Sequence, residues 1–423
     1  MHAELAYLFR HGLIRDAAYE LQTPSSRAAL HGLALRLIEG LYGGRPKFPD
    51  LATTMEAHAL DPMADELALH ASRAEGPEFA TAHANYLWRA AAFADHRNDP
   101  RRAIEFYKEL SRHTAITEEE RLAAARNFGW LLHTTGQTSQ AKEALEQALV
   151  RATGAGLERE ESRLCTVLGQ LYNELGQHAE AWTTLERALV FQRKAGLKAE
   201  ESRALTYMAN TAQKTGKVEQ AEAMYRHALS LAQAAQDQRG MGVALANLAT
   251  VLVRLKRLDE AEATYRRALE LQQKIGNKRI EGVVLGNLAN LLHDKGDHKA
   301  AEGLYMQALE IQRAYGNRRS EGFVLGNLGG LYAATGRLDA AEQCYRQALA
   351  IHEQVGARWS LAVHRCDYAL LKLRRGEPAA AAEVWGQGAA FLSQLGDKSE
   401  LEDKTNAMRK ACDAAGVPPF EPA

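Results

Sequence analysis

The stretch from Val283 to Arg337 reads VVLGNLANLLHDKGDHKAAEGLYMQALEIQRAYGNRRSEGFVLGNLGGLYAATGR, and it holds most of two copies of one pattern. Residues 281–292 are EGVVLGNLANLL, and forty positions later residues 321–332 are EGFVLGNLGGLY. An alanine column keeps this period without exception, and only Lys256 interrupts a glycine column. The two columns are Ala141, Ala181, Ala221, Ala261, Ala301, Ala341 and Ala381, and Gly136, Gly176, Gly216, Gly296, Gly336 and Gly376. A fixed period of this length predicts a solenoid built from repeated units.

Each unit predicts two amphipathic helices joined by a short turn. Residues 285–292 place leucine at helical spacing before Gly296, and residues 301–309 resume that spacing with Ala301 and Tyr305. Gly296 suits the left-handed position that ends a helix. Another column is small throughout: Gly129, Gly169, Ala209, Ala249, Ala289, Gly329 and Ala369. Small residues on facing helices let the two helices approach closely.

The order Leu285-x2-Leu288-Ala289-x2-Leu292, followed by Ala301-x3-Tyr305, resembles the tetratricopeptide repeat. Seven units agree with it. They are similar to the forty-residue units of kinesin light chains and bacterial regulatory proteins. Each unit exceeds the common 34-residue form, which predicts a second helix longer by about a turn and a half. The resemblance implies an all-α solenoid, a right-handed superhelix of helix-turn-helix repeats whose first helices line a concave groove.

The forty-residue register divides the chain into three regions. Residues 1–115 predict an N-terminal helical region with degenerate repeats, residues 116–398 hold the seven units, and residues 399–423 predict a C-terminal capping helix and tail. A cap is expected because the end of a solenoid otherwise exposes an apolar face. Within the first region, residues 43–62 are the best linker candidate, since they hold three prolines and little periodicity.

The run FRHGLIRDAAY at residues 9–19, continued by Arg27, Leu30 and His31, resembles a segment of large bacterial signalling proteins. In those proteins the segment lies between a STAND or AAA-type ATPase module and C-terminal tetratricopeptide repeats, often with a kinase or cyclase domain further upstream. The resemblance implies that this chain is the C-terminal portion of a longer protein. An upstream ATPase, kinase or cyclase module of the same system is therefore a candidate partner.

Charge and composition argue against several kinds of partner. The formal net charge is −1, so the sequence shows no basic footprint for nucleic acid or an anionic membrane surface. No uncharged apolar run approaches the ~20 residues that cross a bilayer, and no signal-peptide pattern opens the sequence. The four cysteines lack CxxC spacing, which favours reduced thiols and a cytoplasmic protein.

No pattern in the sequence indicates catalysis. There is no GxxxxGK[ST] loop and no HExxH. His293 and His298 are five residues apart, the wrong phase for one helical face, and the fifteen histidines follow no ligand spacing. The sequence therefore predicts a protein that is not an enzyme and that has neither a cofactor nor a metal site.

Asparagines recur where the resemblance places the concave side, which is the second, fifth, sixth, ninth, twelfth and thirteenth positions of each first helix. The sixth position carries Asn247, Asn287 and Asn327, and the ninth carries Asn210 and Asn290. In peptide-binding tetratricopeptide repeats, an asparagine at the sixth position holds the ligand backbone. A carboxamide offers a donor and an acceptor, so it can bind a peptide unit whatever its side chain. The alternative is that these asparagines join neighbouring repeats.

Two glycines beside these asparagines are unusual, because glycine within a helix costs about 1 kcal/mol relative to alanine. Either a ligand approaches the backbone at Gly286 and Gly326, or the next helix packs unusually close. The second position is apolar at Val283 and Phe323, a stripe that either receives ligand side chains or belongs to the core. The candidate binding residues are Asn210, Asn247, Gly286, Asn287, Asn290, Phe323, Gly326 and Asn327.

Arginines form a further ladder near the first helices, at Arg239, Arg279 and Arg319, with Arg163 and Arg203 at the second position of earlier units. A basic ladder can bind carboxylates of an acidic partner. The alternative is solvated surface pairing with the glutamates that recur nearby at 201, 281 and 321, and such exposed pairs contribute little.

The sequence thus favours a non-catalytic module that binds a protein or peptide ligand in a concave groove. Its expected setting is the sensor or adaptor arm of a bacterial signalling protein. The alternative is a structural scaffold or oligomerisation platform. An ATPase, kinase or cyclase reading frame upstream of the chain would support the sensor.

Overall fold

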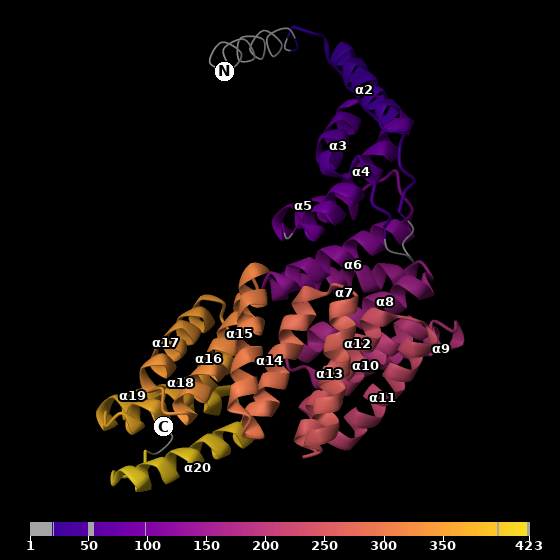
Figure 1. Cartoon of the computed structure of the whole chain (residues 1–423). Helices are drawn as coiled ribbons and strands as arrows, with labels where there is room; N and C mark the ends of the chain where they lie inside the picture. The colour runs from indigo at the N-terminus through magenta and orange to yellow at the C-terminus, as the bar shows by residue number, and fades with distance from the viewer. Residues whose placement is uncertain (1–18, 20, 50–54, 98, 396, 421–423) are drawn as a thin grey trace, which may run out of the picture. The chain divides into compact units, whose positions relative to one another are not determined.

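The computed structural model describes a chain of α-helices joined by short turns, and the residues it describes contain no strand (Figure 1). The described residues are 19, 21–49, 55–97, 99–395 and 397–420. Most of the N-terminal motif, residues 9–18, lies outside them. The all-α prediction is confirmed. The chain divides into two compact units, residues 1–211 (unit 1) and residues 212–423 (unit 2).

Unit 1 holds the shorter N-terminal helices and the first repeats. Its elements are α2 (Pro24–Leu41), η1 (Asp61–Met63), α3 (Ala64–Arg73), α4 (Pro77–His96), α5 (Pro100–Leu110), α6 (Glu118–Thr134), α7 (Thr138–Gly154), α8 (Glu158–Glu174), α9 (His178–Lys194) and most of α10 (Lys198–Lys214). Unit 2 continues with α11 (Val218–Ala234), α12 (Gln238–Arg254), α13 (Leu258–Lys274), α14 (Lys278–Asp294), α15 (His298–Ala314), α16 (Arg318–Ala334), α17 (Leu338–Gln354), α18 (Arg358–Arg374), α19 (Pro378–Leu395) and α20 (Lys398–Ala415).

The forty-residue period is explained by helix length. From α6 to α18 every helix has 17 residues and every connection has three, so two helices and two turns make one unit. The second helix of each pair is therefore as long as the first. The even-numbered helices from α6 to α18 are called first helices below, and the odd-numbered helices from α7 to α19 are called second helices.

A three-residue turn suffices because its last residue serves both helices. After α14, Gly296 adopts a φ of +87°, and the backbone N–H of Asp297 donates to the carbonyl of Leu292 at 2.9 Å. This is the bond that closes a helix past a left-handed residue. The carboxylate of Asp297 then accepts from the N–H of Ala300 at 3.1 Å and caps α15.

Lys256 occupies the glycine position of this turn without changing its geometry. Its φ is +61°, and the N–H of Arg257 still donates to the carbonyl of Leu252 at 2.9 Å. Lys256 therefore adopts the left-handed conformation of the glycine column, and the turn is not altered. A second non-glycine residue, Gln236, has a φ of +54° in the turn before α12. Since side chains disfavour positive φ, α12 lies between two strained turns.

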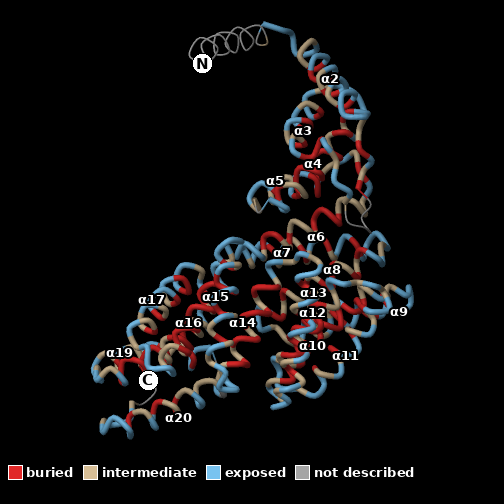
Figure 2. The backbone as a smooth tube through the Cα atoms, viewed as in Figure 1, coloured by how far each residue is buried: buried red, intermediate tan, exposed pale blue. Residues whose placement is uncertain are grey.

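The small columns lie where paired helices meet. Ala289 and Ala301 are both fully buried, as the spacing predicts. At Gly169, an added Cβ would lie 2.5 Å from the Cγ of Leu185, so only glycine allows this helix pair to come together. Figure 2 shows buried residues along the packed faces of the helices and exposed residues at the turns.

The described parts of the linker candidate at residues 43–62 are mostly non-helical and lie between α2 and α3, and they are tied to α4. The Nδ2 of Asn85 donates to the carbonyl of Pro46 at 2.6 Å, and Arg89 forms an ion pair with Asp61 at 2.7 Å. Both charged side chains are more than nine-tenths buried. These buried polar contacts fix the segment against α4.

The last helix covers the end of the repeats. α20 packs against α18 and α19, and its Met408 and Cys412 join a buried cluster with Trp385. Its Lys404 reaches Asp367 of α18 at 2.6 Å. α20 therefore supplies the apolar cover that a terminal repeat requires. None of the helices in the described part of the chain is long and apolar enough to cross a membrane.

Candidate functional site

One face of the first helices in unit 2 remains partly exposed. On α14 the side chains of Val283, Asn287 and Asn290 are partly exposed, whereas residues 284–285 and Leu288 are buried. The same alternation recurs on α12 and α16, and α14 contacts both helices. The exposed positions form a surface called here the unit-2 strip: Val243, Asn247, Val283, Asn287, Asn290, Phe323 and Asn327. They are second, sixth and ninth positions of the first helices.

Two of the predicted asparagines take part in a hydrogen-bond chain between repeats. The hydroxyl of Tyr305 donates to Oδ1 of Asn290 at 2.5 Å, and the Nδ2 of Asn327 donates to the same oxygen at 2.8 Å. The Oδ1 of Asn327 lies 3.3 Å from Nε2 of His364, whose Nδ1 lies 2.9 Å from Nε2 of His352. Asn290 and Asn327 therefore join neighbouring repeats, as the alternative interpretation had it.

Asn247 and Asn287 differ from this pair. Both are partly exposed, and neither side chain forms a hydrogen bond with any residue that the structure describes. Asn210 belongs to α10 in unit 1, so it is not part of the unit-2 strip. Among the predicted asparagines of unit 2, the two at successive sixth positions thus keep their carboxamides available.

The buried glycines of this region are explained by packing. Gly286 and Gly326 are both buried under the following first helix. An added Cβ at Gly326 would lie 2.1 Å from the ring of His364, and one at Gly286 would lie 3.3 Å from Val324. Of the two explanations that the sequence left open, close packing of the next helix is the one observed. Phe323 stays partly exposed, with its ring 5.9 Å from that of His364.

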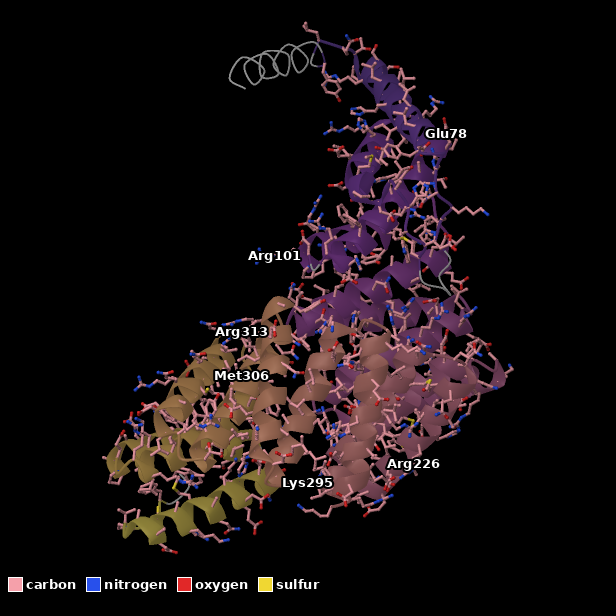
Figure 3. The ribbon with its side chains drawn as sticks, in the orientation of Figure 1. Glu78, Arg101, Arg226, Lys295, Met306 and Arg313 are labelled. Atoms are coloured by element: carbon pink, nitrogen blue, oxygen red, sulfur yellow. The ribbon has the colours of Figure 1, made fainter. Side chains whose placement is uncertain are left out.

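The arginine ladder does not pair with the recurring glutamates. Glu201 binds Arg193 at 2.9 Å, and Glu321 binds Arg313 at 2.9 Å. Lys278 forms an ion pair with Glu281 at 2.8 Å. Figure 3 shows charged side chains such as Arg313 on the surface. In each pair the glutamate is buried and the cation is exposed to water, and water screening of the cation weakens the pair.

Unit 1 contains a pocket that the sequence analysis did not propose. It has a volume of about 430 Å³ and is lined by residues of three successive first helices, α6, α8 and α10, with Gln192 of α9. Its lining includes Arg126, Trp130, Gln170 and Tyr207, which occupy fifth, ninth and sixth positions. The signal was present in Arg163 and Arg203, because second positions carry arginine only in this part of the array. This cavity is called the unit-1 pocket below.

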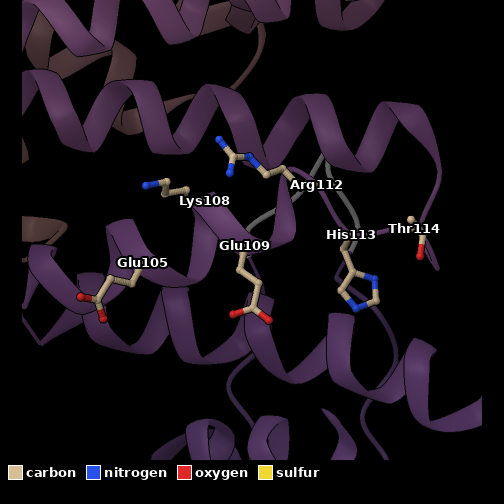
Figure 4. A pocket seen from close by; sticks show the side chains of 6 residues that line it. All are labelled: Glu105, Lys108, Glu109, Arg112, His113 and Thr114. Carbon is tan, nitrogen blue, oxygen red and sulfur yellow. The ribbon is translucent and has the colours of Figure 1, made fainter.

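Another hollow lies on the surface of α5. It has a volume of about 580 Å³ and is lined by one continuous segment, residues 105 and 108 to 109 with 112–114. Figure 4 shows Glu105 and Glu109 on one side of it and Lys108 and Arg112 on the other. Because one helix end and its turn supply every side chain, the hollow is a surface feature. Across the described residues, no group of three histidine, cysteine or acidic side chains could hold a metal ion.

Two buried histidines of the hydrogen-bond chain are expected to make unit 2 sensitive to acid. Burial lowers the pKa of His352 to about 4, helped by Arg319, and lowers the pKa of His364 to about 3, helped by His352 and Lys404. The ordinary imidazole pKa is 6.5, so between pH 6.5 and about 4 the unfolded chain binds protons that the folded chain does not. Stability present above pH 6.5 is therefore expected to fall progressively as the pH drops toward 4.

Thermal melting between pH 7.5 and pH 4.5 measures this effect. The double variant His352→Gln, His364→Asn should show a weaker dependence of melting temperature on pH, whatever its melting temperature at pH 7.5. An identical pH dependence in the variant would show that these two imidazoles do not carry the effect.

Paired helices of equal length with one exposed strip on the first helices define an α-helical repeat protein. The repeats are tetratricopeptide repeats: a family model described as tetratricopeptide repeat matches residues 240–314 and 321–385, and a second model of that description matches residues 162–190 and 202–234. No curated protein matches the chain.

Solved structures share the fold. A Rap protein complexed with competence and sporulation factor has 13% identity and a TM-score of 0.57, over 84% of this chain and 95% of that chain. The Rap conjugation gene regulator of plasmid pLS20, in complex with the Phr* peptide, has 15% identity and a TM-score of 0.55, over 81% and 96%. A STAND protein with a tetratricopeptide repeat sensor from Pyrococcus horikoshii has 13% identity and a TM-score of 0.55, over 82% of this chain and 55% of that chain. At these identities the likeness shows the fold.

Proposed function

We propose that this chain is a non-catalytic module that binds a protein or peptide along the unit-2 strip, as the sensor or adaptor arm of a signalling protein. The observation that carries the proposal is the pair Asn247 and Asn287. They lie forty residues apart on neighbouring first helices, are partly exposed, and have no hydrogen-bond partner among the described residues. Each carboxamide can donate to a peptide carbonyl and accept from a peptide N–H.

The spacing of the helices suits an extended ligand. Packed helix axes lie about 8–10 Å apart, and an extended chain rises about 3.3 Å per residue. A peptide crossing the first helices would therefore meet an equivalent position about every three residues. Val283 and Phe323, which are partly exposed beside the asparagines, would then contact ligand side chains.

The comparisons support the proposal through proteins of the same fold. One of those structures contains competence and sporulation factor, another contains the Phr* peptide, and a third belongs to a STAND protein with a tetratricopeptide repeat sensor. The bound ligands and the sensor role are properties of those proteins. For this chain they indicate that a peptide partner and a sensor role are the hypotheses to test first.

The test is a pull-down from the source cells that compares one double variant with one triple control variant. Asn247→Ala with Asn287→Ala should lose the wild-type partners, because each ligand amide left unpaired costs about 1–3 kcal/mol, or about thirtyfold in affinity at the middle of that range. The control is Arg267→Ala, Gln307→Ala and Gln347→Ala, three exposed residues of second helices. The control should retain the partners, and circular dichroism should show unchanged helicity in both.

Recovery of the same partners by the folded Asn247/Asn287 variant would place the binding surface elsewhere. It would favour the scaffold alternative, in which the helices associate without a peptide ligand. Unfolding of this variant would show that the two asparagines are structural, like Asn290 and Asn327.

A further inference from the structure

We propose that the unit-1 pocket binds a small zwitterion that carries an amine and a carboxylate, as a free amino acid does. The inference goes beyond the unit-2 strip, since it concerns other helices and uses none of the asparagines there. Three hydrogen-bond acceptors and one unpaired cation in the pocket carry it.

Gln192 presents a hydrogen-bond acceptor to the pocket, because its amide nitrogen is already used in a hydrogen bond to Thr166. Gln192 is 1% exposed, and its Nε2 donates to Oγ1 of Thr166 at 3.1 Å. The hydroxyl of Thr166 already donates to the carbonyl of Ser162 at 2.9 Å, so its oxygen can only accept from Gln192. The amide orientation is thereby determined, and Oε1 of Gln192 is left buried without a partner among the described residues.

Two further oxygens are left open for the same kind of reason. The Nε2 of Gln170 donates to the carboxylate of Glu174, which can only accept, so its Oε1 is the unpartnered atom. Glu200 accepts from Arg163 through Oε1 at 3.0 Å, while its Oε2 is buried without a described partner. Each buried acceptor that lacks a hydrogen bond costs about 1–3 kcal/mol. A protonated amine offers three donors, one for each of the three oxygens.

The charges of the pocket specify the other end of the ligand. Arg126 and Arg163 both pair with the buried Glu160, at 3.3 and 2.5 Å, and Arg163 also pairs with Glu200. Arg203 lines the pocket, is exposed, and has no ion-pair partner among the described residues. It follows Glu200 by three residues on α10, which places the two side chains on one face of the helix.

A free carboxylate oxygen and a free guanidinium are therefore neighbours. An amine alone would leave Arg203 unpaired, and a carboxylate alone would leave the three acceptors unsatisfied. A molecule with both groups a few ångströms apart satisfies all four. The rings of Trp130 and Tyr207 supply apolar surface for its side chain, and about 430 Å³ accommodates a molecule of that size, since a water molecule takes about 30 Å³ of liquid.

The experiment screens the proteinogenic L-amino acids against the whole chain by saturation-transfer NMR and measures the best binder by calorimetry. That binder is then compared with the amine lacking its carboxylate and the acid lacking its amine. Both should bind at least about tenfold more weakly, since each loses one set of contacts. Gln192→Leu and Arg203→Ala should each weaken the amino acid about tenfold.

The matched control is Gln272→Leu, the same repeat position in unit 2, which should leave amino acid binding unchanged. Arg203 is exposed, so Arg203→Ala keeps the test valid even where Gln192→Leu fails to fold. The Asn247/Asn287 double variant should also bind the amino acid normally, which separates this site from the unit-2 strip.

The proposal is overturned by any of three results. Absence of binding by every amino acid at about 10 mM, a weak affinity by any standard, would mean that water alone fills the pocket. Equal binding of the amine, or of the acid, would remove the zwitterion requirement. Unchanged affinity in Arg203→Ala would place the ligand elsewhere.

Discussion

Asp61→Ala is expected to lower the free energy of unfolding by about 3–5 kcal/mol, because it leaves the buried guanidinium of Arg89 without a counter-charge. Arg89 and Asp61 are 2.7 Å apart, and their side chains are 5% and 8% exposed. Arg89 also contacts the carbonyls of Glu56 and Lys47, so it ties the chain before η1 to α4. Urea denaturation of the whole chain, followed by circular dichroism, measures the loss.

Asp65→Ala is the matched control. Asp65 pairs with Arg102 between α3 and α5, but those side chains are 33% and 53% exposed. Water screens such a pair, so its loss should cost about 0–1 kcal/mol. If the two variants lose equal stability, burial does not determine the strength of the Arg89–Asp61 pair, and other contacts hold the described residues before η1 against α4.

Gly326→Ala is expected to destabilise unit 2 by about 1–3 kcal/mol, the usual cost of overpacking a well-packed interface. The new Cβ would lie 2.1 Å from the imidazole of His364. That ring is held by His352 on one side and by Asn327 on the other, so it cannot move without breaking a hydrogen bond. The loss should appear even though alanine gains about 1 kcal/mol over glycine within a helix.

Gly286→Ala is the equivalent change one repeat earlier. Its Cβ would lie 3.3 Å from a methyl of Val324, the residue that corresponds to His364. A small shift of that methyl relieves the contact, so the helix-propensity gain should offset most of the cost. Thermal melting of the two variants measures this difference: the melting temperature should fall for Gly326→Ala and change little for Gly286→Ala. Stabilisation by both changes would show that His364 does not require glycine at position 326.

Much of the fold could be predicted from local sequence because each repeat encodes its own helices. The columns of Ala301 and Gly296 recur at forty residues, and one helix pair with its turn explains both. The buried position of Ala289 follows from the same pattern. At Lys256 the left-handed geometry of the glycine column persists even though a side chain disfavours it.

The candidate site was less predictable, because its chemistry depends on pairs of residues from different repeats. Asn287 and Asn327 are identical in type and register, yet only Asn327 meets Asn290 and His364. The unit-1 pocket could not be predicted from the sequence either. There Oε1 of Gln192 is free because the hydroxyl of Thr166 donates to the carbonyl of Ser162 and accepts from the amide nitrogen of Gln192.

The sequence by itself thus determined the all-α class and the tetratricopeptide repeat. These follow from periodicities of 3.6 and forty residues, which neighbouring residues along the chain carry. Only the tertiary structure decided which exposed side chains are free, why Gly326 must be glycine, and that Arg89 ties Lys47, Glu56 and Asp61 to α4. Those outcomes depend on contacts between residues far apart in the sequence, 28 positions in Arg89–Asp61 and 37 in Asn290–Asn327. Their partners differ from one repeat to the next, so no repeating pattern records them.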